Sequence, residues 1–193
     1  MISCFKGKFR VTSPRGYRTL SGKREYHGGM DLVALDDKNV YAVADGKVDA
    51  VPFEANGFGY YVRQLLDDGR RIYYGHMAKG SIAVKAGQSI HKGDKLGVMG
   101  STGNSTGAHT HLELRVKGTS KTSLDIAEFC GIPNKIGTYE YVPMTTAEEK
   151  HKYAVTCAER LEDKTGLEKS TINWLWTYKH ADDLFIKLWE AMK

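Results

Sequence analysis

The sequence has little cysteine and no long apolar run, and both absences narrow the classes of protein it can encode. Its 193 residues hold only three cysteines, Cys4, Cys130 and Cys157, and no Cys-x-x-Cys pair occurs. This spacing argues against a disulfide framework and against a zinc site built from cysteines. No stretch approaches the roughly 20 apolar residues that a membrane-spanning helix needs. We therefore expect a reduced, intracellular place of synthesis and no transmembrane segment.

The first residues, MISCFKGKFRVTSPRGYR, also lack the apolar core of a secretory signal peptide. Unless the chain is a fragment of a longer protein, we expect another factor to deliver it if it works outside the cell that made it. The net charge of +5 suits a polyanionic neighbour, such as nucleic acid, lipid headgroups or the teichoic acids of a cell wall. No run of Lys and Arg is dense enough for a nucleic-acid footprint, so we expect no nucleic-acid partner.

Up to about residue 143 the sequence has the pattern of a β protein. Hydrophobic residues make up 41% and charged residues 26%, as in globular proteins generally. Short alternating runs rich in Gly, Val and Tyr are separated by turn signals, which predicts an antiparallel sheet. Residues 39–51 predict a hairpin that turns at Asp45-Gly46, and residues 59–77 predict another that turns at Asp68-Gly69.

After about residue 144 the pattern becomes helical. Thr146 and Glu149 are spaced as a capping box, and Gly166 is typical of a helix stop. Apolar residues recur at helical spacing in two stretches: Tyr153, Cys157 and Leu161, then Ala181, Leu184, Phe185, Leu188, Trp189 and Met192. All three tryptophans lie in this tail: Trp174, Trp176 and Trp189. The fold class we expect is α+β, with a β-rich domain over residues 1–143 and a small helical appendage over residues 144–193.

Two interpretations of the helical tail stay open. It either forms a cap that buries its apolar stripe within itself or against the sheet, or it binds a cell wall or a protein partner. No low-complexity linker separates the β-rich part from the helical tail, so we expect the tail to dock rather than to hang free.

The stretch GNSTGAHTHLELRV (103–116) holds two histidines one residue apart. In a strand, side chains at i and i+2 point to the same face, about 7 Å apart. The polar face holds His109, His111, Glu113 and Arg115, and the core-facing set is Thr110, Leu112, Leu114 and Val116. Both imidazoles can reach one metal ion or its water, although two ordinary surface histidines explain the pair better when it stands alone.

A histidine and an aspartate stand four residues apart in YHGGMDLVA (26–34). On a straight strand the α-carbons of His27 and Asp31 would be about 13 Å apart, too far to share a zinc ion. Gly28 and Gly29 disfavour a helix, and we expect their tolerance of positive φ to bend the chain until both side chains converge. An imidazole nitrogen and a carboxylate oxygen both bind zinc at roughly 2.0–2.2 Å.

A third element, RIYYGHMAKG (71–80), places His76 at a strand end just after Gly75. Each element alone is weak evidence, because a surface histidine explains it. Together, however, four of the seven histidines and one aspartate fall at three glycine-flanked strand ends. This convergence predicts a catalytic zinc site, in which three protein ligands leave one position open for water.

These motifs resemble, in order and spacing, the lysostaphin-type (LytM-like) zinc metallopeptidases, which cut the peptide part of bacterial peptidoglycan. The resemblance rests on HGGMD (27–31), YGHM (74–77) and GSTGNSTGAHTHLELR (100–115), and it covers about residues 10–133. The three motifs in this order are far more specific than any one of them.

The resemblance implies a role for each residue of the motifs. His27, Asp31 and His111 match the ligands of one Zn²⁺ per chain. His76 and His109 match the two catalytic histidines that do not bind the metal. By this analogy they orient or deprotonate the activated water, and they stabilise the oxyanion or pass a proton to the leaving amine. Which histidine does which is left open.

Several further residues carry weaker expectations. Glu113 either orients an imidazole or forms a plain exposed salt bridge. Tyr60, Ala108 and Thr110 depart from the residues that are usual in the family, and we expect them at the rim of the substrate groove. The other histidines are expected on the surface: His91, His151 and His180.

The sequence therefore predicts a zinc-dependent endopeptidase acting on peptidoglycan peptides. Residues 125–134 resemble the end of the catalytic domain in some bacterial and phage members, and the tail is similar to segments of phage wall-lytic proteins. We expect synthesis in the cytoplasm and action on the bacterial wall after phage-type release. One alternative is a non-enzymatic wall-binding or hydrolase-activating module with the same fold. A nucleic-acid binder is a second alternative, which rests on charge alone.

Overall fold

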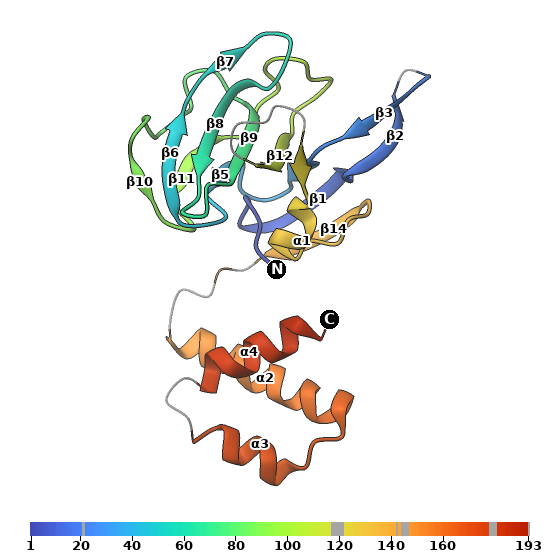
Figure 1. Cartoon of the computed structure of the whole chain (residues 1–193), viewed down its shortest axis with the longest axis vertical. Coiled ribbons are helices and arrows are strands. Elements are labelled where there is room, and N and C mark those ends of the chain that lie inside the picture. The colour runs from blue at the N-terminus through green and yellow to red at the C-terminus, as the bar shows by residue number, and fades with distance from the viewer. Residues whose placement is uncertain (21, 117–121, 142, 144–146, 178–180, 193) are drawn as a thin grey trace. The chain divides into compact units, whose positions relative to one another are not determined.

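The computed structural model divides the chain into two compact units, Met1–Val142 and Pro143–Lys193 (Figure 1). It describes residues 1–20, 22–116, 122–141, 143, 147–177 and 181–192. The strands, all in the N-terminal unit, are β1 (Gly7–Ser13), β2 (Gly16–Leu20), β3 (Lys23–His27), β4 (Met30–Ala34), β5 (Asn39–Tyr41), β6 (Gly46–Ala50), β7 (Phe53–Glu54), β8 (Gly59–Leu65), β9 (Arg71–Met77), β10 (Ser89–Ile90), β11 (Lys95–Val98), β12 (Thr110–Arg115), β13 (Ser123–Leu124) and β14 (Gly137–Tyr141). The helices are α1 (Ile126–Cys130) in the N-terminal unit and α2 (Ala147–Thr165), α3 (Lys169–Leu175) and α4 (Ala181–Ala191) in the C-terminal unit.

The main sheet is antiparallel, as the alternating sequence predicts. Its strand order is β10-β6-β8-β9-β12-β4-β1-β14, with β7 beside β8 and β13 beside β12. Two smaller ladders pair β5 with β11 and β2 with β3. Strand β12 therefore lies in the middle of the sheet between β9 and β4, where neighbours on both sides fix its position.

One face of the sheet builds the core of the N-terminal unit. The core-facing set predicted on β12 is confirmed for Thr110, Leu112 and Leu114, which are buried, whereas Val116 is 40% exposed just past the strand end. Other strands add large apolar side chains to the same core: Phe9, Leu32, Ile72 and Tyr74. The opposite, polar face of β12 is thereby left for the histidine cluster.

The hairpin predicted over residues 59–77 is confirmed. Strands β8 and β9 pair antiparallel, and Gly69 takes a positive φ of 85° in the turn. The hairpin predicted over residues 39–51 is wrong, because β5 pairs with β11 and β6 pairs with β8 and β10. Gly46 serves close packing instead, since a Cβ there would lie 2.4 Å from the Leu65 carbonyl oxygen.

A short helix, α1, follows the sheet and has no counterpart in the sequence prediction. The Asp125 side chain caps it by accepting a hydrogen bond from the Glu128 amide at 3.0 Å. Gly131 ends it in the left-handed region with φ 64°. The capping aspartate and the closing glycine are local signals that could have revealed the helix.

The C-terminal unit has a core of its own. Its buried residues come from three helices: Ala154, Cys157, Ala158, Leu161, Ile172, Ala181 and Phe185. Helix α2 ends just before Gly166, which has a φ of 68° and confirms the predicted stop. Leu188, expected on the buried stripe, is 38% exposed.

Some sequence expectations for this unit lie outside the described residues. The capping pair is one of them: Thr146 is not described, nor is the side chain of Glu149. The side chain of Tyr153 and the whole of His180 are likewise not described. None of the helices in the described ranges combines the length and the apolar character needed to cross a membrane.

Candidate metal centre

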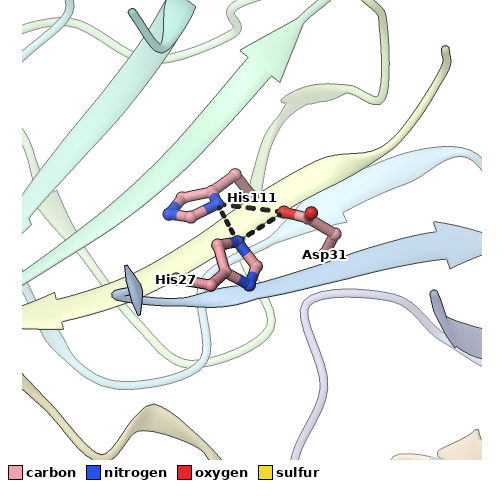
Figure 2. Close-up of side chains that lie close together, drawn as sticks. All are labelled: His27, Asp31 and His111. Carbon is pink, nitrogen blue, oxygen red and sulfur yellow. Dashed lines mark hydrogen bonds and ion pairs between the residues drawn. The ribbon is translucent and has the colours of Figure 1, made fainter. Parts of the chain in front are cut away.

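Three strands bring an imidazole, a carboxylate and a second imidazole to one point. His27 ends β3, Asp31 lies in β4, and His111 lies opposite Asp31 in the register of β12. His27 Nε2 lies 3.1 Å from Asp31 Oδ1 and 3.1 Å from His111 Nδ1, and His111 Nδ1 lies 2.9 Å from Asp31 Oδ1. Figure 2 shows these three atoms as a triangle above the sheet. The expected convergence of His27 and Asp31 therefore occurs.

The glycines between His27 and Asp31 work by size rather than by positive φ, contrary to the sequence expectation. Neither Gly28 nor Gly29 is among the residues with positive φ. A Cβ on Gly28 would lie 2.6 Å from Glu113 Oε1, and one on Gly29 would lie 2.7 Å from His111 Nε2. The glycine pair leaves the space that the His111 and Glu113 side chains occupy.

The second nitrogen of each imidazole in the triangle is bound to an acceptor, which fixes the tautomer. His27 Nδ1 donates to the Pro14 carbonyl oxygen at 2.9 Å, so its Nε2 carries the lone pair. His111 Nε2 donates to Glu113 Oε2 at 3.1 Å, so its Nδ1 carries the lone pair. Both lone pairs and an Asp31 oxygen therefore face the same point.

Three electron-rich atoms at hydrogen-bond distance require a positive charge between them, either a proton or a metal cation. Burial raises the pKa of the Asp31 carboxyl, but its contacts with the His111 and His27 imidazoles outweigh burial and hold that pKa well below its usual range. Burial lowers the pKa of His111, but the neighbouring Asp31 and Glu113 carboxylates raise it overall. The electrostatics of the triangle thus favour a cation.

The donor set fits zinc. Two imidazole nitrogens and one carboxylate oxygen are the ligand types of catalytic zinc sites. Bonds of about 2.0–2.1 Å in a tetrahedron hold ligand atoms about 3.3 Å apart, close to the 2.9–3.1 Å observed. The three donors lie within 4.8 Å of one another and are drawn from buried and half-buried residues. They would supply three of the four ligands of a tetrahedral zinc site, and a fourth position would remain for water or substrate.

An arginine that the sequence reasoning missed holds the other oxygen of Asp31. Arg18 Nη1 donates to Asp31 Oδ2 at 3.1 Å and to Ser13 Oγ at 2.8 Å, and its Nε donates to Glu25 Oε1 at 2.8 Å. Because Oδ2 is occupied, Oδ1 is the oxygen presented to a metal. The sequence reasoning assigned Arg18 no role, since an arginine in a polar hairpin is ordinary.

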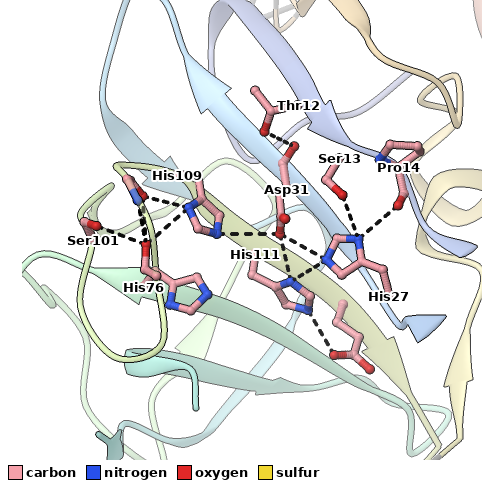
Figure 3. Close-up of polar contacts among 12 residues, drawn as sticks. Thr12, Ser13, Pro14, His27, Asp31, His76, Ser101, His109 and His111 are labelled. Carbon is pink, nitrogen blue, oxygen red and sulfur yellow. Dashed lines mark hydrogen bonds and ion pairs between the residues drawn. The ribbon is translucent and has the colours of Figure 1, made fainter. Parts of the chain in front are cut away.

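The two remaining motif histidines stand beside the triangle (Figure 3). His109 Nδ1 donates to the Gly107 carbonyl oxygen at 2.8 Å, and His109 Nε2 lies 3.6 Å from Asp31 Oδ1. His76 Nδ1 donates to the Thr102 carbonyl oxygen at 2.8 Å, and its ring centre lies 4.6 Å from that of His109. In both imidazoles Nε2 is left with the lone pair, available to exchange protons.

His76 is held in an unusual backbone conformation. It is the one non-glycine residue with positive φ among those described, at 60°. Such a conformation costs about 1 kcal/mol or more for a residue with a side chain, so neighbouring contacts have to enforce it. The His76 amide donates to the Phe58 carbonyl oxygen at 2.6 Å, and burial lowers the pKa of His76 to about 4. The imidazole is therefore neutral near pH 7.

The residues expected at the groove rim or on the surface differ in how exposed they are. Thr110 is fully buried, so its expected place at the rim is wrong. Ala108 is exposed and Tyr60 is half-buried. His91 and His151 are exposed, as predicted.

Comparison with known proteins gives concordant matches. The profile of Peptidase family M23 matches residues 25–123, which include all five motif residues. The peptidoglycan DD-endopeptidase ShyC of Vibrio cholerae is 32% identical over 116 residues, covering 58% of this chain and 26% of ShyC. The chain spans only about a quarter of the length of the curated relatives it matches.

Two solved structures share the fold of the N-terminal unit. A variant of the catalytic domain of EnpA, a prophage-encoded M23 protein of Enterococcus faecalis, aligns with a TM-score of 0.55 at 33% identity. That alignment covers 64% of this chain and 92% of the EnpA domain. The catalytic domain of the antimicrobial peptidase lysostaphin of Staphylococcus simulans gives 0.55 at 27% identity, covering 63% and 91%.

The family profile spans half of the chain, and the EnpA domain is covered almost whole. The antiparallel sheet, the clustered histidines and these matches agree with the resemblance seen in the sequence. The chain belongs to Peptidase family M23, the lysostaphin-type zinc metallopeptidases.

Proposed function

We propose that this chain is a zinc-dependent endopeptidase that hydrolyses peptide bonds in bacterial peptidoglycan. The observation that carries the proposal is the triangle of His27, Asp31 and His111 with two further imidazoles beside it. Membership of family M23 and the similarity to a peptidoglycan DD-endopeptidase support this choice of substrate.

In this proposal His27 Nε2, Asp31 Oδ1 and His111 Nδ1 hold one zinc ion. When bound, zinc supplies a Lewis acid that polarises a peptide carbonyl and lowers the pKa of a bound water to about 7. Arg18 keeps Asp31 turned so that one oxygen faces the site. The Pro14 carbonyl and Glu113 hold the two imidazoles in the tautomers that the role requires.

His109 and His76 are the proton-transfer groups. His109 Nε2 is the nearer to the ligand atoms, at 3.6 Å from Asp31 Oδ1, so we assign it to take the proton of the attacking water. The His76 ring lies 4.6 Å from the His109 ring and 6.2 Å from the His111 ring. Its Nε2 starts with a lone pair, so we assign it to receive the water's proton from His109 and then to pass it to the leaving amine. The carbonyls of Gly107 and Thr102 keep both Nε2 atoms unprotonated before the reaction.

Digestion of purified peptidoglycan tests the proposal. The full chain, loaded with zinc, is incubated with sacculi of several defined chemistries, and released muropeptides are identified by mass spectrometry. We expect new amino termini within the stem or cross-bridge peptides. His109→Ala should retain zinc and lose hydrolysis, whereas Asp31→Ala should lose both. A His109→Ala chain as active as the wild type would refute the assigned role, and zinc-loaded wild type that releases nothing would favour a non-enzymatic wall-binding module.

We further propose that delivery to the wall is of the phage or prophage type. Similarity to the prophage-encoded protein EnpA supports this route. If it is correct, the chain expressed in the cytoplasm lyses its host only when a membrane-permeabilising protein is co-expressed. Lysis without that protein would contradict it.

We propose that residues 144–193 form an accessory module outside the reaction. Two facts support this role: the helices have their own core, and the family profile ends at residue 123. The module binds the wall or a protein partner, or it docks on the catalytic unit. Sedimentation of the full chain and of a chain lacking the module with intact walls distinguishes wall binding from the other roles.

A further inference from the structure

Glu113 lies two residues from the proposed zinc ligand His111 and forms a buried ion pair with Arg115. Arg115 Nε donates to Glu113 Oε1 at 2.8 Å, and Arg115 Nη2 donates to Glu113 Oε2 at 2.9 Å. This is a bidentate pair, the strongest geometry of an arginine–carboxylate contact. Glu113 is only 4% exposed, so its charge is compensated inside the protein rather than by water.

Glu113 passes this constraint to the proposed ligand. Its Oε2 accepts hydrogen bonds from both Arg115 Nη2 and His111 Nε2. The three side chains therefore form one line of hydrogen bonds that ends at His111 Nδ1, the atom of the triangle. The sequence leaves two roles open for Glu113, orienting an imidazole or forming an exposed salt bridge. The structure confirms the contact with the His111 imidazole, whereas the salt bridge with Arg115 is buried rather than exposed.

Two aromatic rings also hold the guanidinium of Arg115 in place. Arg115 lies over the Tyr73 ring at 4.7 Å and over the Phe58 ring at 5.1 Å. Phe58 and Tyr73 stack on each other at 5.4 Å, and Phe58 also lies 5.4 Å from the His111 ring. A guanidinium stacks on aromatic faces while donating in its plane, which an ammonium group does not do.

We propose that Arg115 is a positioning residue for zinc binding, acting through Glu113 on the imidazole of His111. The proposal rests on the assignment of His111 as a zinc ligand in the proposed function. Arg115 holds Glu113 in one orientation and balances its buried charge, and Glu113 then fixes the tautomer and ring plane of His111. Disturbing partners that orient a metal-ligating histidine typically weakens metal binding about 10–100-fold.

Zinc affinity of the full chain, measured by competition with a chelating dye, tests the inference without any substrate. Arg115→Met keeps the apolar stem over the two rings but removes all hydrogen bonds to Glu113. We expect it to bind zinc at least about 10-fold more weakly than the wild type. Arg115→Lys keeps the charge without the bidentate geometry and should fall between the two. Near-UV circular dichroism checks that each variant is folded.

A double-mutant cycle separates positioning from a general structural effect. Glu113→Gln alone should weaken zinc binding, and adding Arg115→Met in that background should change the dissociation constant by less than about twofold, because the path through Glu113 is already broken. Arg71→Met is the matched control. Arg71 faces Arg115 across the β9–β12 ladder and pairs with Asp49 at 2.9 Å, so its loss should leave zinc affinity unchanged.

Three outcomes would overturn the inference. One is wild-type zinc affinity in folded Arg115→Met and Arg115→Lys. Another is the same loss from Arg115→Met with and without Glu113→Gln. The third is an equal loss in Arg71→Met. A wild-type chain that binds zinc but cleaves no peptidoglycan overturns the proposed function and leaves this inference standing.

Discussion

Replacing Gly29 by alanine tests how tightly the backbone between β3 and β4 packs against β12 at the metal centre. A Cβ at this position would lie 2.4 Å from the Leu112 carbonyl oxygen, 2.7 Å from His111 Nε2 and 2.9 Å from the Glu113 Cβ. The first contact is about 1 Å inside van der Waals distance, and the oxygen cannot retreat because Leu112 is paired with both β4 and β9. We expect Gly29→Ala to lower the free energy of unfolding by about 3 kcal/mol or more. Because His111 has to move, zinc binding should weaken at least about 10-fold.

Urea unfolding of the zinc-free chain and chelator competition measure the two effects of Gly29→Ala separately. Gly107→Ala is the control, since Gly107 does not have positive φ and a Cβ there would meet no described atom within 4 Å. That variant should stay within about 0.5 kcal/mol of the wild type. If Gly29→Ala is as stable as Gly107→Ala and binds zinc normally, the chain relaxes around the added methyl group and the packing argument is refuted.

Three further predictions concern other parts of the N-terminal unit and the thiols. Thr110 is fully buried and its hydroxyl has no hydrogen-bond partner among the described residues, so Thr110→Val should raise the free energy of unfolding by about 1–2 kcal/mol in urea titrations, and destabilisation would contradict this. Burial raises the pKa of Cys130 to about 12 and that of Cys4 well above its usual value, and Cys157 is also buried; a thiol reagent at pH 8 should therefore modify no cysteine in the folded chain and all three after denaturation. Burial lowers the pKa of His76 to about 4, so between about pH 6.5 and pH 4 the unfolded chain binds a proton at this residue that the folded chain does not. The zinc-free wild type should lose about 2–3 kcal/mol more over this range than His76→Asn, which tolerates the same backbone conformation without titrating, and parallel pH profiles would exclude His76 as the cause.

The parts of the fold that could be predicted from the sequence are those set by local patterns. Alternation along 109–116 fixed which side of the strand faces the core, and the Asp68-Gly69 turn identified its hairpin. The Asp45-Gly46 turn signal was equally strong, but the hairpin it predicted does not form, because the choice of partner strand depends on tertiary contacts. Strand β5 found β11 more than fifty residues away.

In the candidate site, too, local sequence signals were readable and tertiary contacts were not. Its histidines and aspartate stood out because their residue types and glycine neighbours are readable in the sequence. Arg18 did not, since its contact with Asp31 depends on how the β2–β3 hairpin sits beside β4. The role of Gly28 and Gly29 was misjudged for a related reason. The atoms that exclude a Cβ there belong to residues more than eighty positions later in the chain.

The triangle of donor atoms also has a consequence for the order of folding. His27 and His111 are separated by 84 residues, so a cation shared between them closes a loop of nearly half the chain. In chain-entropy terms, a permanent cross-link over such a loop would be worth about 4–5 kcal/mol. A partly folded chain in which β12 has not yet paired with β4 offers only two of the three donors. If His27, Asp31 and His111 hold the zinc ion as proposed, tight zinc binding reports that β12 has paired with β4 in the middle of the sheet.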